Sequence, residues 1–253
     1  MQIFISPSKA LDFDTAKSIG ETSIPFFLKE AEKINAGIKR KSRKGLVSLQ
    51  GISPQLANLN YHRNQDWKLE NTAQAQAAMA FKGDVYLGMQ AENWSMEDMK
   101  FANQHLFILS GLYGLLRPGD LIKPYRLEMG TQLKIARREN LYKFWFDKFA
   151  KYFRQNIDKD EIFVNLASQE YFKAISQSKP KNKVVHIEFK DFSNGKYKVV
   201  GFFAKKARGM MANYIIQNRI TSLKEISAFN LNGYYFDDSS SNEFHYIFLR
   251  DAQ

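Results

Sequence analysis

The chain contains no cysteine among its 253 residues, and this absence excludes several kinds of site. Disulfides, thiolate zinc sites, iron–sulfur clusters and cysteine nucleophiles all need the sulfur atom. The four histidines lie far apart and lack the short spacings typical of metal ligands; they are His62, His105, His186 and His245. The sequence therefore predicts no metal site, and it favours a cytoplasmic location.

Long apolar runs are also missing. No segment approaches the roughly 20 residues that a helix needs to span a bilayer. Residues 1–6 pass directly into a strand-like sequence, without a basic and then apolar leader. We therefore expect no membrane association and no export.

Linkers rich in glycine, serine or proline are not evident, and only 6 prolines occur in the chain. With 44% hydrophobic and 14% aromatic residues, the chain can bury a sizeable core. We expect residues 1–253 to form a single domain.

Negative charge is the minority charge. The chain has 37 Lys and Arg against 26 Asp and Glu, which gives a formal net charge of +11. This positive net charge favours anionic partners, but only the positions of the cations in the sequence can indicate which partner binds.

The hydrophobic pattern predicts an α+β fold, a single compact mixed α/β unit with antiparallel strand pairs. Expected helices cover residues 24–38, 46–61 as a helical hairpin, 73–81, 95–102, 141–153 and 207–218, and a further helix follows residues 162–166 with Ser168 as its cap. Ser95 with Asp98 predicts a capping box for the helix at 95–102, and Asn140 is the predicted N-cap of the helix at 141–153. Expected strands or extended segments cover residues 3–5, 84–87, 106–109 and 162–166, with antiparallel pairs at 184–189 with 197–203 and at 234–236 with 244–249. Asn194-Gly195 is the typical turn for the first of these pairs.

The helical hairpin is the first candidate site. Residues 49–57 (Leu-Gln-Gly-Ile-Ser-Pro-Gln-Leu-Ala) resemble a helix-hairpin-helix DNA-binding motif, with Gly51 present and Ser53 in place of the second glycine. Backbone N–H groups at such a turn and helix start can bind a phosphate oxygen. The cations directly before it could contact the same phosphates; they are Lys39, Arg40, Lys41, Arg43 and Lys44. The alternative is that Gly51 only closes a turn between two helices and that the cations are solvated.

A second candidate is the cationic segment that contains Lys205, Lys206 and Arg208. No acidic residue occurs between Asp191 and Glu225, so the local charge is unopposed in sequence. Cations at a helix start can bind phosphate together with the helix dipole. Alternatively, these long side chains extend to solvent from a core helix.

A third candidate is the glycine-punctuated segment 109–130, which follows a predicted buried strand. Its polar and aromatic residues would line a ligand pocket there; they are Tyr113, Arg117, Tyr125, Arg126 and Glu128. The segment contains no Walker motif, dinucleotide fingerprint or nucleophile elbow, and we expect no cofactor. The alternative for Arg126 and Glu128 is a structural ion pair.

Together these segments resemble the YaaA family of peroxide-stress proteins. The resemblance is carried by residues 6–9 (Ser-Pro-Ser-Lys), 81–88, 109–130, 165–173, 204–209, 229–230 and 233–237. It implies a cytoplasmic bacterial protein that limits peroxide damage by keeping unincorporated iron low. It also implies a family-specific α+β fold with a basic cleft, a helix-hairpin-helix-like element and binding to double-stranded DNA.

Two functions of different classes follow. The first is a non-enzymatic stress protein that binds DNA without sequence specificity, with Lys39, Arg40, Lys41, Arg43 and Lys44 on phosphates and Gly51 and Ser53 fixing the register. The alternative is an enzyme acting on a small phosphorylated or carboxylated molecule. Its pocket would contain the residues of the second and third candidates together with Lys9, Asp84 and Tyr86. Direct iron binding is a third hypothesis, which no ligand spacing supports.

Overall fold

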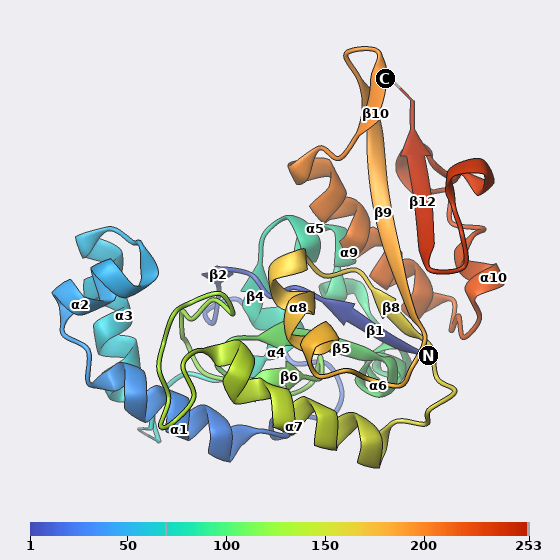
Figure 1. Ribbon diagram of the computed structural model, residues 1–253. Helices are drawn as coiled ribbons and strands as arrows, with labels where there is room; N and C mark the ends of the chain where they lie inside the picture. The colour runs from blue at the N-terminus through green and yellow to red at the C-terminus, as the bar shows by residue number, and fades with distance from the viewer. Residues whose placement is uncertain (69, 252–253) are drawn as a thin grey trace.

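A mixed β-sheet forms the centre of the computed structural model, which describes residues 1–68 and 70–251 (Figure 1). The strand order is β11-β12-β9-β8-β1-β5-β6, and β10 pairs with β9 outside this order. Their bounds are β1 (Gln2–Ile5), β5 (Leu106–Ser110), β6 (Gly114–Leu116), β8 (Phe163–Asn165), β9 (Val184–Ser193), β10 (Lys196–Lys198), β11 (Tyr234–Phe236) and β12 (His245–Arg250). Two small strand pairs lie outside the sheet, β2 (Ala10–Leu11) with β4 (Phe81–Lys82) and β3 (Ala75–Gln76) with β7 (Leu121–Ile122).

The strand directions are parallel at the centre of the sheet and antiparallel toward its edges. Strand β1 is parallel to both β5 and β8, and β9 is parallel to both β8 and β12. The pairs β5–β6, β9–β10 and β11–β12 are antiparallel. The predicted mixed α/β class with antiparallel pairs is confirmed, but the parallel centre was not predicted.

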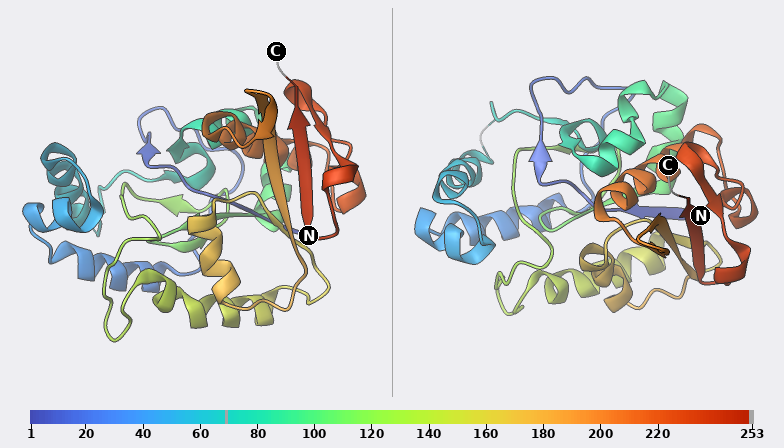
Figure 2. Two further views of the ribbon diagram at one scale, coloured as in Figure 1. Left: turned by 45° about the horizontal axis from the view of Figure 1, so that its top comes forward. Right: turned by 90° about the horizontal axis from the view of Figure 1, so that it is seen from above.

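The helices cover both faces of this sheet. In the view from above, α7 and α8 lie on one side of β1, and α5 and α6 lie on the other (Figure 2). The helix bounds are α1 (Leu28–Lys39), α2 (Arg43–Gln50), α3 (Pro54–Asp66), α4 (Ala77–Ala80), α5 (Asp84–Met89), α6 (Met96–His105), α7 (Leu141–Asn156), α8 (Gln169–Gln177), α9 (Gly201–Gln217) and α10 (Leu223–Ile226). Three 3-10 turns complete the chain, η1 (Ala91–Asn93), η2 (Leu231–Gly233) and η3 (Asp238–Ser240). None of these helices is long and apolar enough to cross a bilayer, so far as residues 1–68 and 70–251 are concerned.

The core is aromatic where β1 meets its neighbours. The Phe4 ring centroid lies 4.9 Å from that of Phe163 in β8 and 5.6 Å from that of Phe107 in β5. All four residues of β1 and all five of β5 are buried. Such continuous apolar strands are typical of a parallel sheet covered on both faces.

Several helix ends follow the predicted capping chemistry. Ser95 and Asp98 form a complete capping box at the start of α6, and the Asn140 side chain accepts a hydrogen bond from the Lys143 N–H at the start of α7. Each side-chain acceptor satisfies an N–H that has no partner within its helix.

Three local predictions were wrong. Residues 84–87 form most of helix α5 rather than an extended segment, because tertiary packing against α9 holds this six-residue helix. Residues 73–81 contain only the single turn α4 between β3 and β4, and the buried Gln76 there bonds to the backbone of Ile19. Residues 201–203 begin helix α9 instead of extending β10, which ends at Lys198.

Helices α5 and α9 touch backbone to backbone. A Cβ atom on Gly88 of α5 would lie 2.1 Å from the Lys206 carbonyl oxygen. One on Gly209 of α9 would lie 1.8 Å from the Val85 carbonyl oxygen. Because neither distance leaves room for a carbon atom, only glycine permits this approach.

Replacing Gly209 with Ala should therefore destabilise the protein. We expect the free energy of unfolding to fall by about 1–3 kcal/mol, the usual cost of overpacking, as measured by urea denaturation. Gly201→Ala is the matched control in the same helix, because its Cβ would meet no atom within 4 Å. Equal stability of the two variants would contradict the close contact.

Candidate functional site

A cavity lies where β1 and β8 end. These parallel neighbours finish at the same edge of the sheet, at Ile5 and Asn165. The next strand of the sheet after β1 is β5, which pairs with β1 on the side away from β8. The next strand after β8 is β9, which pairs with β8 on the side away from β1. In open α/β sheets, ligands bind in the crevice at such a change of direction. The cavity here has a volume of about 480 Å³.

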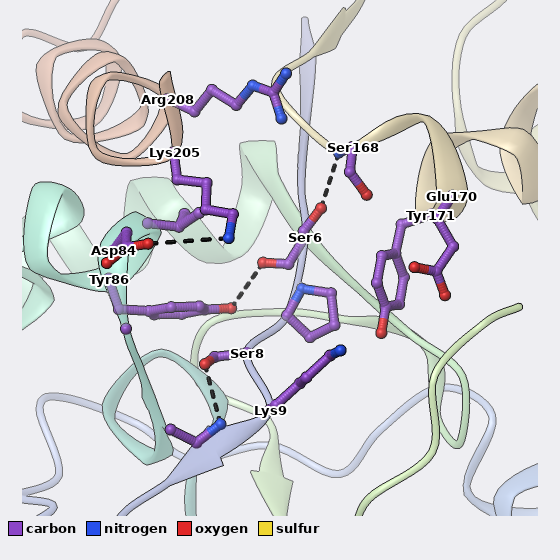
Figure 3. Close-up of a pocket in the computed structure, with 14 residues that line it drawn as sticks. Ser6, Ser8, Lys9, Asp84, Tyr86, Ser168, Glu170, Tyr171, Lys205 and Arg208 are labelled. Carbon is purple, nitrogen blue, oxygen red and sulfur yellow. Dashed lines mark hydrogen bonds and ion pairs between the residues drawn. The ribbon is translucent and has the colours of Figure 1, made fainter. Parts of the chain in front are cut away.

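Four segments far apart in sequence supply the walls of this cavity (Figure 3). They are the loop after β1, the start of α5, the start of α8 and one face of α9. Pairing of β2 with β4 holds the first two segments together. The polar and charged lining residues are Ser6, Ser8, Lys9, Asp84, Tyr86, Ser168, Glu170, Tyr171, Lys205 and Arg208.

Ser6 connects three of these walls. Its hydroxyl oxygen accepts a hydrogen bond from the Ser168 N–H at 2.9 Å, and its carbonyl oxygen accepts one from the Tyr86 hydroxyl at 3.2 Å (Figure 3). Burial raises the pKa of Tyr86 well above its ordinary value, and the neighbouring Tyr125 and Tyr171 contribute in the same direction. Tyr86 therefore stays protonated and acts as a hydrogen-bond donor.

Helix α9 contributes two cations to the cavity, Lys205 and Arg208, and because α9 begins at Gly201 they lie within the helix and not at its start as predicted. The Lys205 amine lies 3.9 Å from an Asp84 carboxylate oxygen, a loose ion pair (Figure 3). The Arg208 Nε is buried and has no hydrogen-bond partner in the part of the chain that the structure describes. Burial lowers the pKa of Arg208, and Glu188 partly opposes this shift. Arginine nevertheless remains charged, so an incoming acceptor would gain a charged donor.

The start of α8 also favours an anion. Ser168 is the N-cap residue, but its side chain makes no capping hydrogen bond. Ser168, Glu170 and Tyr171 at this end of the helix line the cavity, so the positive end of the helix dipole is directed toward it.

Carboxylates occupy another part of the wall. Glu170 accepts a hydrogen bond from the Gly130 N–H at 2.9 Å. At the rim, Glu128 pairs with Lys9 at 2.8 Å and with Arg126 at 3.1 Å. The Arg126–Glu128 ion pair, which was the alternative to a pocket role, is thus present, on an irregular segment rather than on a strand.

Other residues of the predicted pocket lie outside the cavity lining. Tyr125 hydrogen-bonds to Ser110 at 2.7 Å between the two hydroxyls, and the Tyr113 hydroxyl accepts from the Lys123 N–H at 3.0 Å. Both phenols are buried, and burial raises their pKa. Arg117 pairs with Asp120 at 2.9 Å, and the Lys206 backbone faces α5 at the Gly88 contact. Of the predicted pocket residues, the cavity is lined by Lys9, Asp84, Tyr86, Lys205 and Arg208.

The sequence analysis did not name Ser6, Ser168, Glu170 or Tyr171 as pocket residues, although all four lie in segments that carry the family resemblance. A signal was available, because short polar residues follow two predicted buried strands, at Ser6 and at Ser168. The sequence did not reveal that these two strands are parallel neighbours in the sheet, which brings the residues after them together.

The second candidate surface is the helix pair α2 and α3. Gly51 ends α2 in a left-handed conformation with φ 61°, and the Ser53 hydroxyl caps α3 by accepting from the Leu56 N–H. The N–H groups of Gly51 and Ile52 are both directed to the Val47 carbonyl oxygen. The turn N–H groups are therefore occupied, and the start of α3 is the end of this pair that can face an anion.

The five cations of residues 39–44 divide into two groups. The Lys39 amine donates to the Gln65 carbonyl oxygen at 3.0 Å, and the Arg43 Nε donates to Asn58 at 2.6 Å. These two side chains join the helices to one another. All five side chains are exposed, and Arg40, Lys41 and Lys44 are the three that make no such helix-joining hydrogen bond among the described residues.

A second hollow, of about 520 Å³, adjoins two of these exposed cations. Its walls include Lys33, Arg40, Lys41 and Lys134. Lys33 was not predicted, although it precedes Arg40 by seven residues and so shares a face of helix α1 with it. Lys134 follows a loop, and no sequence pattern connects it with α1.

A comparison with protein families identifies the family of this chain. The family model described as peroxide stress protein YaaA matches residues 1–240, which is nearly the whole chain. This match supports a role in peroxide stress. The chain therefore belongs to the YaaA family of peroxide stress proteins.

Proposed function

We propose that this protein acts in the peroxide-stress response by binding double-stranded DNA, without sequence specificity, and by helping to keep unincorporated iron low. The iron component rests on family membership. The DNA component rests on the α2–α3 pair and the cations beside it. Binding to chromosomal DNA would place the protein in the bacterial cytoplasm.

The observation that carries the DNA proposal is the exposed position of α2 and α3. The pair lies at the edge of the molecule, away from the central sheet (Figure 1). The start of α3 and the side chains of Arg40, Lys41 and Lys44 are open to solvent there. Cations and a helix start together bind backbone phosphates, which position a protein without reading bases.

A second candidate function is an enzyme for a small phosphorylated or carboxylated molecule. It is favoured by the cavity at the ends of β1 and β8, where Lys205 and Arg208 line the same space as carboxylates and hydroxyls. A volume of about 480 Å³ suits a small ligand and excludes a duplex. Lys9, Asp84 and Glu170 are the groups available for acid–base chemistry in it.

The DNA proposal predicts that the affinity for duplex DNA depends on salt and that Arg40, Lys41 and Lys44 control this dependence. Log affinity should fall linearly with log salt, with a slope of about −0.9 per neutralised phosphate. Changing Arg40, Lys41 and Lys44 to Gln should reduce the magnitude of that slope by roughly 2–3 units, measured by fluorescence anisotropy on a labelled duplex.

The matched control removes three exposed cations from the hollow beside the end of α7. Changing Arg154, Lys159 and Lys181 to Gln alters the net charge equally and should leave the slope within about one unit. Equal slope changes in both variants would show that net charge, and not the α2–α3 surface, governs binding.

The turn between α2 and α3 supplies a separate prediction. Gly51→Val should weaken duplex binding without changing the salt slope, because it strains a left-handed backbone position and removes no charge. Gly195→Val is the control, since Gly195 also has a positive φ and open space around it but lies in the β9–β10 loop. If the Gly51 variant binds the duplex with wild-type affinity, the turn has no role in DNA binding.

A further inference from the structure

The cavity at the ends of β1 and β8 combines an anion-binding end with a wall of aromatic and carboxylate groups. We propose that it binds a phosphorylated nucleoside, with the phosphate between Arg208, Lys205 and the start of α8. The inference rests on the second candidate function and names its ligand class.

The phosphate position follows from the unsatisfied groups. Arg208 Nε is buried without a partner among the described residues, and the Lys205 amine has only the loose contact to Asp84. Ser168 leaves its capping position unused at the start of α8. Burying a charged donor without a partner is costly, and a phosphate oxygen would remove that cost at Arg208, with Lys205 and the start of α8 adding positive charge beside it.

The remainder of the cavity is larger than a phosphate needs, and aromatic and acidic side chains line it. The rings of Tyr86 and Tyr171 form walls on opposite sides of the Ser6 loop (Figure 3). Asp84 and Glu170 add hydrogen-bond acceptors, which would repel a bare polyphosphate but can accept from the amino groups of a base. A volume of about 480 Å³ accommodates a sugar and a base beyond the phosphate.

The mouth of the cavity is joined to the proposed DNA surface by a chain of contacts. Lys9 at the rim pairs with Glu128, which also pairs with Arg126. The Arg126 carbonyl oxygen accepts a hydrogen bond from Gln50 of α2 at 2.8 Å. The phosphorylated nucleoside can therefore be a free nucleotide or the terminal nucleotide of a DNA strand held at the α2–α3 pair.

The test is calorimetric titration of the full chain with deoxyadenosine 5′-monophosphate, deoxyadenosine and inorganic phosphate. We expect the monophosphate to bind at least about tenfold more tightly than either fragment, because it engages both ends of the cavity. Deoxyadenosine that binds as tightly as its monophosphate would overturn the proposed phosphate position.

Two neighbouring lysines of α9 provide a matched pair of variants. Lys205→Gln should weaken monophosphate binding about tenfold, since it removes a charged hydrogen bond, and Arg208→Gln should do at least as much. Lys206→Gln removes the same charge one residue away, outside the cavity lining, and should change the affinity less than about twofold. Lys205 is 60% exposed, so its replacement leaves the fold intact. Equal effects at Lys205 and Lys206 would overturn the assignment.

The source of the nucleotide is distinguished with two duplexes that differ only in a 5′-phosphate or a 5′-hydroxyl end. A preference for the phosphorylated end that Lys205→Gln abolishes identifies a DNA terminus, whereas tight binding of the free monophosphate without an end preference identifies a soluble nucleotide. Both results support the cavity ligand. Loss of the salt slope in the Arg40, Lys41 and Lys44 variant reports on the DNA proposal separately, so either proposal can fail alone.

Discussion

The backbone contact between α5 and α9 is the constraint on which the candidate pocket depends. Gly88 and Gly209 allow the two helices to approach closer than any side chain would permit. That approach places Asp84 and Tyr86, at the start of α5, beside Lys205 and Arg208 of α9. The parallel pairing of β1 with β8 brings the other two walls to the same place. The cavity is therefore a consequence of helix packing and strand direction together.

Two surfaces suited to anions lie on one connected framework. The cavity is a pocket of about 480 Å³ lined by residues of both charges, which suits a small ligand with one phosphate. The α2–α3 surface is open and cationic, which suits a polymer of phosphates. The segment from Arg126 to Glu128 touches both of them, through Gln50 on one side and Lys9 on the other. The two proposals together place DNA binding and nucleotide binding within the same molecule.

Sequence patterns predicted the elements whose signals are local. The capping residues of α6 and α7, the buried strands and the two helices around Gly51 all lie where periodicity and capping chemistry put them. The sequence patterns gave wrong predictions where tertiary contacts determine the local structure. Gly83 and Gly88 suggested an extended segment between them, yet Gly88 serves the contact with α9 and the residues between are helical. In the site, charged residues such as Lys205 and Arg208 were found by their sequence context, whereas Ser168 and Glu170 needed the parallel pairing of strands, which no local pattern encodes.

Amide hydrogen exchange with and without deoxyadenosine 5′-monophosphate tests the central claim most directly, because it reports where the ligand orders the backbone. The account predicts slower exchange in the loop after β1 and at the start of α8, residues 6–10 and 168–171, with little change in α2 and α3. Slowing confined to α2 and α3, or no slowing in residues 168–171 at a saturating ligand concentration, would contradict a nucleotide site at the ends of β1 and β8.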